Sequence, residues 1–189
     1  MRTWGVTRSP VSRPGSPAEY PPSEDTFLLA DYIGGARGGA ALDIGTGSGY
    51  LARLLEGRFG LVVATDIDAA VLADQTYPAG DRVCCDAASA LNMSFDLVVC
   101  NMPYLATESV EDPATDGGPG GTEVPLRILR SARPRIAPGG RMAFTTTSLS
   151  DHGRLVAECA HLGMPARIAS RRRLFFEELL LVEASLPAQ

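Results

Sequence analysis

The chain has 189 residues, of which 45% are hydrophobic, and it carries a formal net charge of −5 in which all 17 of the Lys and Arg positions are arginine. This length supports one well-buried core and is short for two ordinary domains, so we expect a single domain over residues 20–189. The acidic balance disfavours tight nucleic-acid binding, which depends on a basic face. The only basic run, residues 171–173, is interpreted as a solvated turn between two late strands, with a phosphate-binding patch as the less favoured alternative.

Residues 1–19 differ in composition from the rest, since they are rich in Pro, Ser and Arg and contain the single tryptophan. We expect a flexible arm there. No apolar run approaches the roughly 18 residues of a membrane span, and the N-terminus lacks a signal-peptide pattern, so we expect a cytoplasmic protein. The four cysteines lack metal-binding spacing, which predicts buried, reduced thiols and no metal site: Cys84, Cys85, Cys100 and Cys159.

Helices and strands alternate along the chain, a pattern typical of an α/β fold with a doubly wound sheet. In the first half we expect strands over 40–44, 61–65, 82–85 and 95–100. We also expect three helices: one over 24–33 capped by Ser23, one carrying Leu51, Leu54 and Leu55, and a short one capped by Asp68 and ended by Pro78. In the second half we expect a loop over 105–121, helices over 122–133 and around Leu155, and strands over 141–146, 167–170 and 174–184. The consecutive apolar residues 179–182 predict a strand covered on both faces.

The glycine-rich segment Asp43-Ile-Gly-Thr-Gly-Ser-Gly49 joins the first strand to the next helix, where ligands bind in such sheets. Its spacing fits Gly-x-Gly-x-x-Gly poorly, because Tyr50 or Ala52 stands at the third glycine. The Asp43 carboxylate suits a cationic ligand better than a pyrophosphate. S-adenosylmethionine, with a sulfonium and an ammonium group, is such a ligand.

Two further aspartates follow strands at the same predicted edge. Asp66 ends the second strand, where a carboxylate can accept hydrogen bonds from both ribose hydroxyls, although it could also be a turn or cap residue. Asp86 follows the third strand and could accept from an adenine amino group, or it could cap the segment after it.

The tetrapeptide Asn101-Met-Pro-Tyr104 leaves the fourth strand beside this predicted site. A planar amide or aromatic amine is a poor nucleophile, so its attack on a sulfonium methyl needs orientation more than a strong base. The Asn101 side-chain oxygen and the carbonyl of Met102 can accept its two N–H bonds and stabilise the positive charge that develops. Pro103 fixes the turn, and the ring of Tyr104 can stack on the flat substrate group. A plain structural turn is the alternative.

In combination, these motifs resemble the HemK family of protein-glutamine N5-methyltransferases. The resemblance covers residues 20 to about 184 and rests on Tyr20-Pro-Pro-Ser-Glu-Asp-Thr-Phe-Leu-Leu29, Asp43–Gly49, Ala64-Thr-Asp-Ile67, Asn101–Tyr104 and the glycine-rich Asp116–Gly121. It is closest to the short archaeal and eukaryotic branch, and it implies the seven-stranded, Rossmann-like class I fold of S-adenosylmethionine-dependent methyltransferases.

The resemblance implies methylation of the glutamine in the Gly-Gly-Gln loop of class 1 translation release factors. The implied catalytic residues are Asn101, Met102, Pro103 and Tyr104. The implied cofactor residues are Tyr20, Thr26, Asp43, Gly45, Thr46, Gly47, Gly49, Asp66, Ile67, Asp86, Ala87 and Asn101, with Thr26 helping to hold the methionine carboxylate. Met102 departs from the proline usual in the family; it acts through its backbone carbonyl, so activity should survive with a less rigid loop.

Two alternative functions and one partner remain open from the sequence. The turn Asn101–Tyr104, which we call the clamp, also fits an amino group of adenine or guanine in RNA or DNA, although a flipped base usually needs a basic groove. The chain could also be a non-catalytic, cofactor-binding scaffold. In the family's short branch a small zinc-binding activator docks at the edge of the sheet, here the strand over 82–85, unless that short edge is covered by the chain itself.

Overall fold

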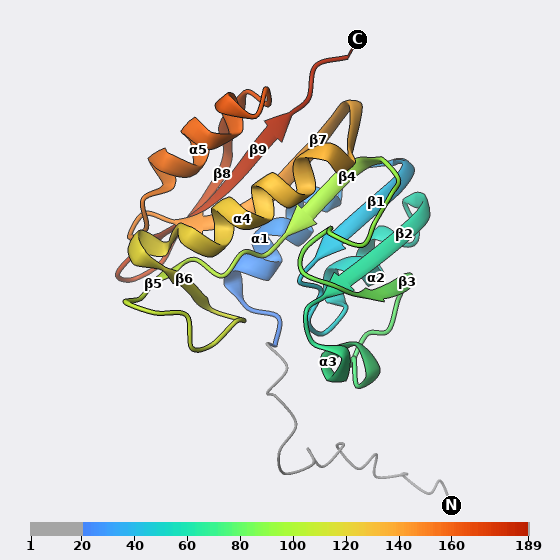
Figure 1. Cartoon of the computed structure of the whole chain (residues 1–189), viewed down its shortest axis with the longest axis horizontal. Helices are drawn as coiled ribbons and strands as arrows, with labels where there is room; N and C mark the ends of the chain where they lie inside the picture. The colour runs from blue at the N-terminus through green and yellow to red at the C-terminus, as the bar shows by residue number, and fades with distance from the viewer. Residues whose placement is uncertain (1–20, 189) are drawn as a thin grey trace, which may run out of the picture.

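The computed structural model describes residues 21–188, which form a seven-stranded sheet between two helical layers (Figure 1). The strand order is β3-β2-β1-β4-β7-β9-β8, and only β9 runs antiparallel to its neighbours. This confirms the doubly wound, seven-stranded prediction. The strands are β1 (Gly38–Ile44), β2 (Phe59–Asp66), β3 (Asp81–Cys84), β4 (Phe95–Cys100), β7 (Ile136–Thr147), β8 (Ala166–Arg173) and β9 (Glu178–Ser185).

The helices divide the core into two halves, one on each face of the sheet. Helices α1 (Glu24–Ile33) and α2 (Tyr50–Leu55) cover one face, and α4 (Glu123–Ala132) and α5 (His152–His161) cover the other (Figure 1). Strand β9 contributes Leu179 and Leu181 to the first half and Val182 to the second, so the prediction that 179–182 is covered on both faces is confirmed. The short α3 (Ala69–Ala73) ends before Pro78.

The predicted loop over 105–121 contains regular structure, which corrects that expectation. A small parallel pair, β5 (Leu105–Ala106) and β6 (Asp116–Gly118), is followed by a 3₁₀ turn, η1 (Pro119–Gly121). Leu105 N–H donates to the Thr115 carbonyl at 3.0 Å, and Thr107 N–H to Gly118 at 3.2 Å. A second 3₁₀ turn, η2 (Arg133–Arg135), follows α4.

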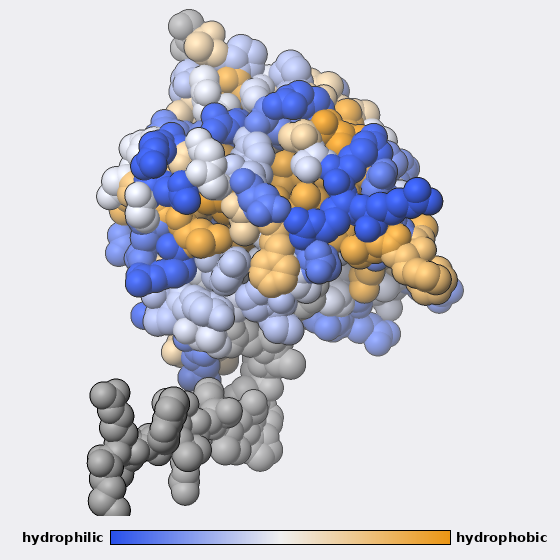
Figure 2. All heavy atoms as spheres, turned by 180° about the vertical axis from the view of Figure 1, so that it is seen from behind, coloured by the Kyte–Doolittle hydropathy of each residue, from blue (hydrophilic) through white to orange (hydrophobic). Residues whose placement is uncertain are grey.

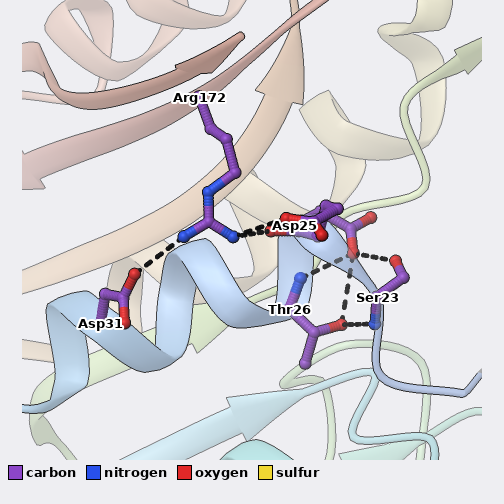
Figure 3. Close-up of polar contacts among 6 residues, drawn as sticks. Ser23, Asp25, Thr26, Asp31 and Arg172 are labelled. Atoms are coloured by element: carbon purple, nitrogen blue, oxygen red, sulfur yellow. Dashed lines mark hydrogen bonds and ion pairs between the residues drawn. The ribbon is translucent and has the colours of Figure 1, made fainter. Parts of the chain in front are cut away.

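The arginine run 171–173 lies inside β8, so its interpretation as a solvated turn is wrong. Arg171 pairs with Glu178 on β9 at 2.5 Å. Arg172 lies across α1, where it binds Glu24 at 2.9 Å and Asp31 at 2.8 Å (Figure 3). These partners let a charged segment form an outer strand, and the turn is residues 174–177, which were predicted to be part of the last strand.

The prediction of buried thiols holds for Cys100 and Cys159 and is wrong for Cys84, which is exposed, while Cys85 is half-buried. The reason is that β3 is a short edge strand with β2 on one side only within the described residues. No helix in residues 21–188 is both long and apolar enough to cross a membrane. The predicted arm and Tyr20 lie outside the described residues.

Candidate active site

A cavity of about 870 Å³ opens at the carboxyl ends of β1, β2 and β4. Most of the predicted site residues line it: Thr26, Gly45, Thr46, Gly47, Asp66, Ile67, Asp86, Ala87, Asn101 and Pro103. Asp43, Gly49, Met102 and Tyr104 do not line it. The motifs from four separate parts of the chain therefore converge on one pocket, with four of their residues in supporting positions.

The glycine loop needs glycine for two different reasons. Gly45 and Gly47 have φ of 65° and 49°, and no described atom lies within 4 Å of where a Cβ would project. Their backbone is therefore open on the side that a ligand can approach. Gly49, with φ of 80°, is a packing position, because a Cβ there would lie 2.2 Å from the carbonyl oxygen of Tyr77.

Asp43 lies beneath the loop and is 1% exposed, so its predicted contact with a cationic ligand is not supported. One carboxylate oxygen accepts from the Thr46 hydroxyl at 2.8 Å and from the Ala52 N–H at 3.0 Å. The other oxygen has no hydrogen-bond partner among the described residues. Burial raises the pKa of Asp43 to about 7, against the lowering effect of these two hydrogen bonds. Asp43 therefore ties the loop to helix α2.

Asp66 ends β2 and lines the cavity beside the glycine loop. Its carboxylate accepts from the N–H of Gly47 at 3.0 Å and from the N–H of Asp68 at 3.0 Å. Each carboxylate oxygen has a second lone pair, so hydroxyl groups of a ligand can still be accepted. The position agrees with the predicted ribose contact.

Asp86 and Ala87 follow β3 at the far side of the same cavity. Asp86 is exposed and lies 3.6 Å from the guanidinium of Arg127 on α4. Ala87 has φ of 50°, the one left-handed non-glycine residue in the described chain. A strained backbone at a cavity wall is a recurring property of ligand sites.

Asn101 is held by hydrogen bonds on both sides of its amide. Its Oδ1 accepts from the Thr145 hydroxyl on β7 at 2.5 Å, and its Nδ2 donates to the Thr26 hydroxyl at 3.3 Å. Thr26 is itself bound through Asp25, whose carboxylate accepts from the Thr26 N–H at 2.6 Å (Figure 3). The amide orientation assigned in this way leaves one Oδ1 lone pair for a substrate.

The turn after Asn101 is supported by α1 and by the glycine-rich motif. The Tyr104 hydroxyl donates to Asp25 at 2.9 Å, and Met102 is buried in the core. A Cβ at Gly117 would lie 2.8 Å from the carbonyl oxygen of Pro103, and one at Gly121 would lie 2.3 Å from that of Tyr104. Only glycine permits this close approach, which explains the downstream glycine motif.

Sequence reasoning missed Asp25, Thr145 and Arg127. Asp25 is 3% exposed and accepts hydrogen bonds from Thr26 and from the Tyr104 hydroxyl. It therefore links the residue that binds the Asn101 amide to the end of the turn after Asn101. An acidic residue in the first turn of a helix is normally assigned to the helix dipole, so its local context concealed this role. Thr145 is a β-branched residue inside a strand and carries no sequence signal for a site.

Comparisons with known proteins agree with this geometry. Residues 24–179 match the family model described as a methyltransferase domain. An archaeal protein provisionally named as a protein N5-glutamine methyltransferase, from Methanocaldococcus jannaschii, is 26% identical over 89% of this chain and 92% of its own length. Methyltransferase HEMK2 of Mus musculus is 27% identical over 88% of this chain and 89% of its own.

Among solved structures, the E. cuniculi Mtq2–Trm112 complex, described as responsible for methylation of the eRF1 translation termination factor, has a chain that superposes with a TM-score of 0.77. The identity is 27%, over 88% of this chain and 98% of that one. The chain therefore belongs to the family of methyltransferase domains, within its HemK branch.

Proposed function

We propose that this protein methylates the side-chain nitrogen of the glutamine in the Gly-Gly-Gln loop of a class 1 translation release factor, with S-adenosylmethionine as cofactor. The observation that carries the proposal is Asn101, which lines the same cavity as the glycine loop and has its amide fixed by Thr145 and Thr26. The name of the archaeal relative specifies glutamine N5-methylation and the E. cuniculi complex is described as methylating eRF1, and both support the substrate assignment.

The residues of the cavity fit this cofactor. The open faces of Gly45 and Gly47 leave room for a ligand against the backbone, and the Asp66 carboxylate can accept from ribose hydroxyls. Asp86 can accept from an adenine amino group. The Thr26 hydroxyl lines the cavity and donates to Asp25 at 3.2 Å, so it would have to turn from Asp25 to donate to the methionine carboxylate. When bound, S-adenosylmethionine supplies an electrophilic methyl group on its sulfonium.

The chain's own residues orient the glutamine amide. The free lone pair of Asn101 Oδ1 and the Met102 carbonyl accept the two amide N–H groups, which turns the nitrogen toward the methyl group. These oxygens would also stabilise the positive charge on nitrogen in the transition state, and the proton that the methylated nitrogen loses would pass to solvent water. Tyr104 does not line the cavity, and its hydrogen bond to Asp25 anchors the turn that carries Asn101. Met102 is compatible with this role, because its side chain is buried and its contribution is a backbone carbonyl.

The charge around the cavity favours a polypeptide over a nucleic acid. Residues 105–126 contain five acidic side chains, and Glu111 and Asp112 line the cavity, in which Arg127 is the one basic residue among the lining residues. A phosphate backbone would be repelled there. The acidic rim therefore favours the release factor over methylation of an adenine or guanine amine.

The proposal includes a small partner protein at β3, which we infer to be a zinc-binding activator. Strand β3 pairs with β2 alone in the described part of the chain, Cys84 is exposed, and Ile67 beside it is 55% exposed. An added strand would pair the open edge and cover these side chains. The E. cuniculi relative was solved with its partner Trm112, which supports the assignment. Because release factors act on ribosomes, the proposed location is the cytoplasm.

The test incubates the protein, with and without a candidate activator, with labelled S-adenosylmethionine and one of three acceptors: a release factor, tRNA or DNA. The proposal expects label in the release factor, mapped by mass spectrometry to the glutamine. A release factor with Gly-Gly-Ala in place of Gly-Gly-Gln is the matched control and should stay unlabelled. Label in tRNA or DNA would support the nucleic-acid alternative, and cofactor binding without label in any acceptor would support the scaffold.

A further inference from the structure

The turn between β8 and β9 exposes two adjacent aromatic side chains. Phe175 and Phe176 are 91% and 86% exposed, and their rings contact each other edge to face with centroids 4.7 Å apart. Leu149, in the turn after β7, is 67% exposed. We call these three residues the rim patch. In the view from behind, apolar side chains gather at the right-hand edge of the molecule, where the β8–β9 turn lies (Figure 2).

The two turns that carry the rim patch are bonded to each other. Ser148 N–H donates to the Glu178 carbonyl at 2.9 Å, and Glu178 N–H donates to the Ser148 hydroxyl at 3.0 Å. The Thr147 hydroxyl also donates to the carboxylate of Glu177. The exposed side chains therefore stand on a supported surface and not on an isolated loop.

The same segment contacts the clamp. Asp151 N–H donates to the Gly120 carbonyl at 3.0 Å, and Ser150 Cβ would lie 2.7 Å from a Cβ at Gly121, the glycine that packs on Tyr104. Figure 1 shows the β8–β9 turn at the same end of the sheet as β5 and β6. The turn that carries Leu149 therefore packs, through Gly121, on the turn that follows Asn101.

The strand register gives the approximate distance between Asn101 and the aromatic residues of the rim patch. Asn101 is bonded to Thr145, which is paired with Leu181 on β9, and Phe176 is five residues before Leu181. At about 3.3 Å per residue along a strand and about 4.8 Å between strands, the turn lies within roughly 20 Å of Asn101. An extended polypeptide whose glutamine sits at Asn101 would need about six residues to reach it.

Strand β8 is held by ion pairs that do not involve the aromatic pair. Arg171 binds Glu178, and Arg172 binds Glu24 and Asp31 on α1 (Figure 3). Exposed apolar side chains that serve no packing role and border a functional site mark interaction surfaces. We propose that the rim patch docks the protein substrate, by contacting an apolar segment of the release factor outside its Gly-Gly-Gln loop; this inference rests on the proposed function.

Two other occupants fit the observations less well. A membrane surface is bound by an excess of positive charge around the apolar residues. Here the three arginines of residues 171–178 are offset by two glutamates of the same segment and by Glu24 and Asp31 on α1, which bind Arg172. A second copy of this chain would need a far larger apolar face than three side chains provide.

The test compares steady-state kinetics of the wild-type protein, with its activator if one is required, and the double variant Phe175→Ala/Phe176→Ala. With the intact release factor, the variant should show a KM raised about tenfold or more and an unchanged kcat, because aromatic anchors dominate such contacts. With a short Gly-Gly-Gln peptide that cannot reach the turn, both proteins should have the same KM. Met93→Ala is the matched control, since Met93 is 36% exposed and lies just before β4, at the opposite end of the sheet.

The outcomes separate this inference from the proposed function. Wild-type methylation with an unchanged KM in the double variant, or an equal loss on the short peptide, would overturn the docking surface alone. Loss of binding to anionic vesicles together with an unchanged KM would assign the patch to a membrane and also overturn it. A wild-type protein that methylates neither substrate would overturn the proposed function and the inference with it.

Discussion

Asn101 is the residue whose side-chain amide is expected to contact the reacting nitrogen of the substrate. Its Oδ1 is aimed by the Thr145 hydroxyl, and the Asn101→Ala variant should retain most cofactor affinity while kcat/KM falls by roughly 10²- to 10³-fold, as for loss of one transition-state hydrogen bond in a preorganised site. Kinetics with a Gly-Gly-Gln substrate measures the loss, and calorimetry with S-adenosylhomocysteine measures the affinity.

Thr145→Val is the matched variant for Asn101→Ala. It removes the donor that orients the amide and keeps the amide itself, so the expected loss is smaller, about tenfold for one hydrogen bond. Equal turnover of Asn101→Ala and wild type would remove Asn101 from the catalytic role. Equal losses in both variants would mean that orientation accounts for the whole effect.

Asp43 is a second residue whose environment makes a measurable prediction, here on stability. Burial raises its pKa from the ordinary 3.8 to about 7, so between these values the folded state binds more protons than the unfolded state. The free energy of unfolding should therefore fall, through this group, as pH rises from about 4 to about 7. The effect is on the order of a few kcal/mol.

Asp43→Asn tests this without removing the acceptor that Thr46 and Ala52 use. Relative to wild type, the variant should gain stability between about pH 5 and about pH 8, because it has no charge to bury. Urea denaturation at both pH values measures the difference. Parallel stability changes in the two proteins would show that Asp43 does not titrate in this range.

At the scale of whole elements, β3 is one of the two edge strands of the seven-stranded sheet, and in residues 21–188 it pairs with β2 alone. Cys84→Asp should weaken assembly with the activator, since a charge on the exposed face of an edge strand opposes addition of another strand. The lone subunit should also be poorly soluble in its wild-type form. Size-exclusion chromatography with light scattering measures both properties.

Ser170→Asp is the control for this prediction, because Ser170 is an exposed small residue on β8, the opposite edge of the sheet. It should leave assembly unchanged. Cys84 also lines the cavity, so cofactor binding must be measured in parallel. A wild-type chain that is soluble, monomeric and fully active without an activator would argue against the partner.

Elements with a local cause were predictable from the sequence, and those with a distant cause were not. The helix over 24–33 and the strand over 95–100 follow from capping and apolar pattern, and they occur at those bounds. The strand through Arg172 depends on Glu24, which is 148 positions away in the chain. Local pattern carries no information on such a partner, and a run of three arginines argues for solvent.

The same distinction applies to the candidate site. Gly45, Asp66 and Asn101 could be found because their types at strand ends are informative by themselves. Asp25 could not, because its contact with Tyr104 joins residues 79 positions apart. For Asp43 the motif was recognised, but the expected contact of its carboxylate with a cationic ligand is not supported. The carboxylate lies beneath the loop, where the Thr46 hydroxyl and the Ala52 N–H bind it.

At the scale of the whole molecule, the fold brings these strand ends together around the cavity. A ligand bound there should raise the free energy of unfolding of the whole domain. S-adenosylhomocysteine at about 100 times its Kd adds about 2.7 kcal/mol to the free energy of unfolding. For a chain of this size that corresponds to a rise in Tm of roughly 5 to 10 °C. Differential scanning calorimetry measures the shift.

The variant pair Asp66→Ala and Asp68→Ala decides whether this stabilisation comes from the predicted contact. Both lose one negative charge at the same wall of the cavity, but only Asp66 faces the glycine loop through its bond to Gly47, whereas Asp68 caps α3. Asp66→Ala should weaken S-adenosylhomocysteine binding and reduce the rise in Tm, while Asp68→Ala should preserve both. Stabilisation of the wild-type protein by NAD and not by S-adenosylhomocysteine would show that the cavity serves a different cofactor, because mass action stabilises the fold only through a ligand that the folded state binds.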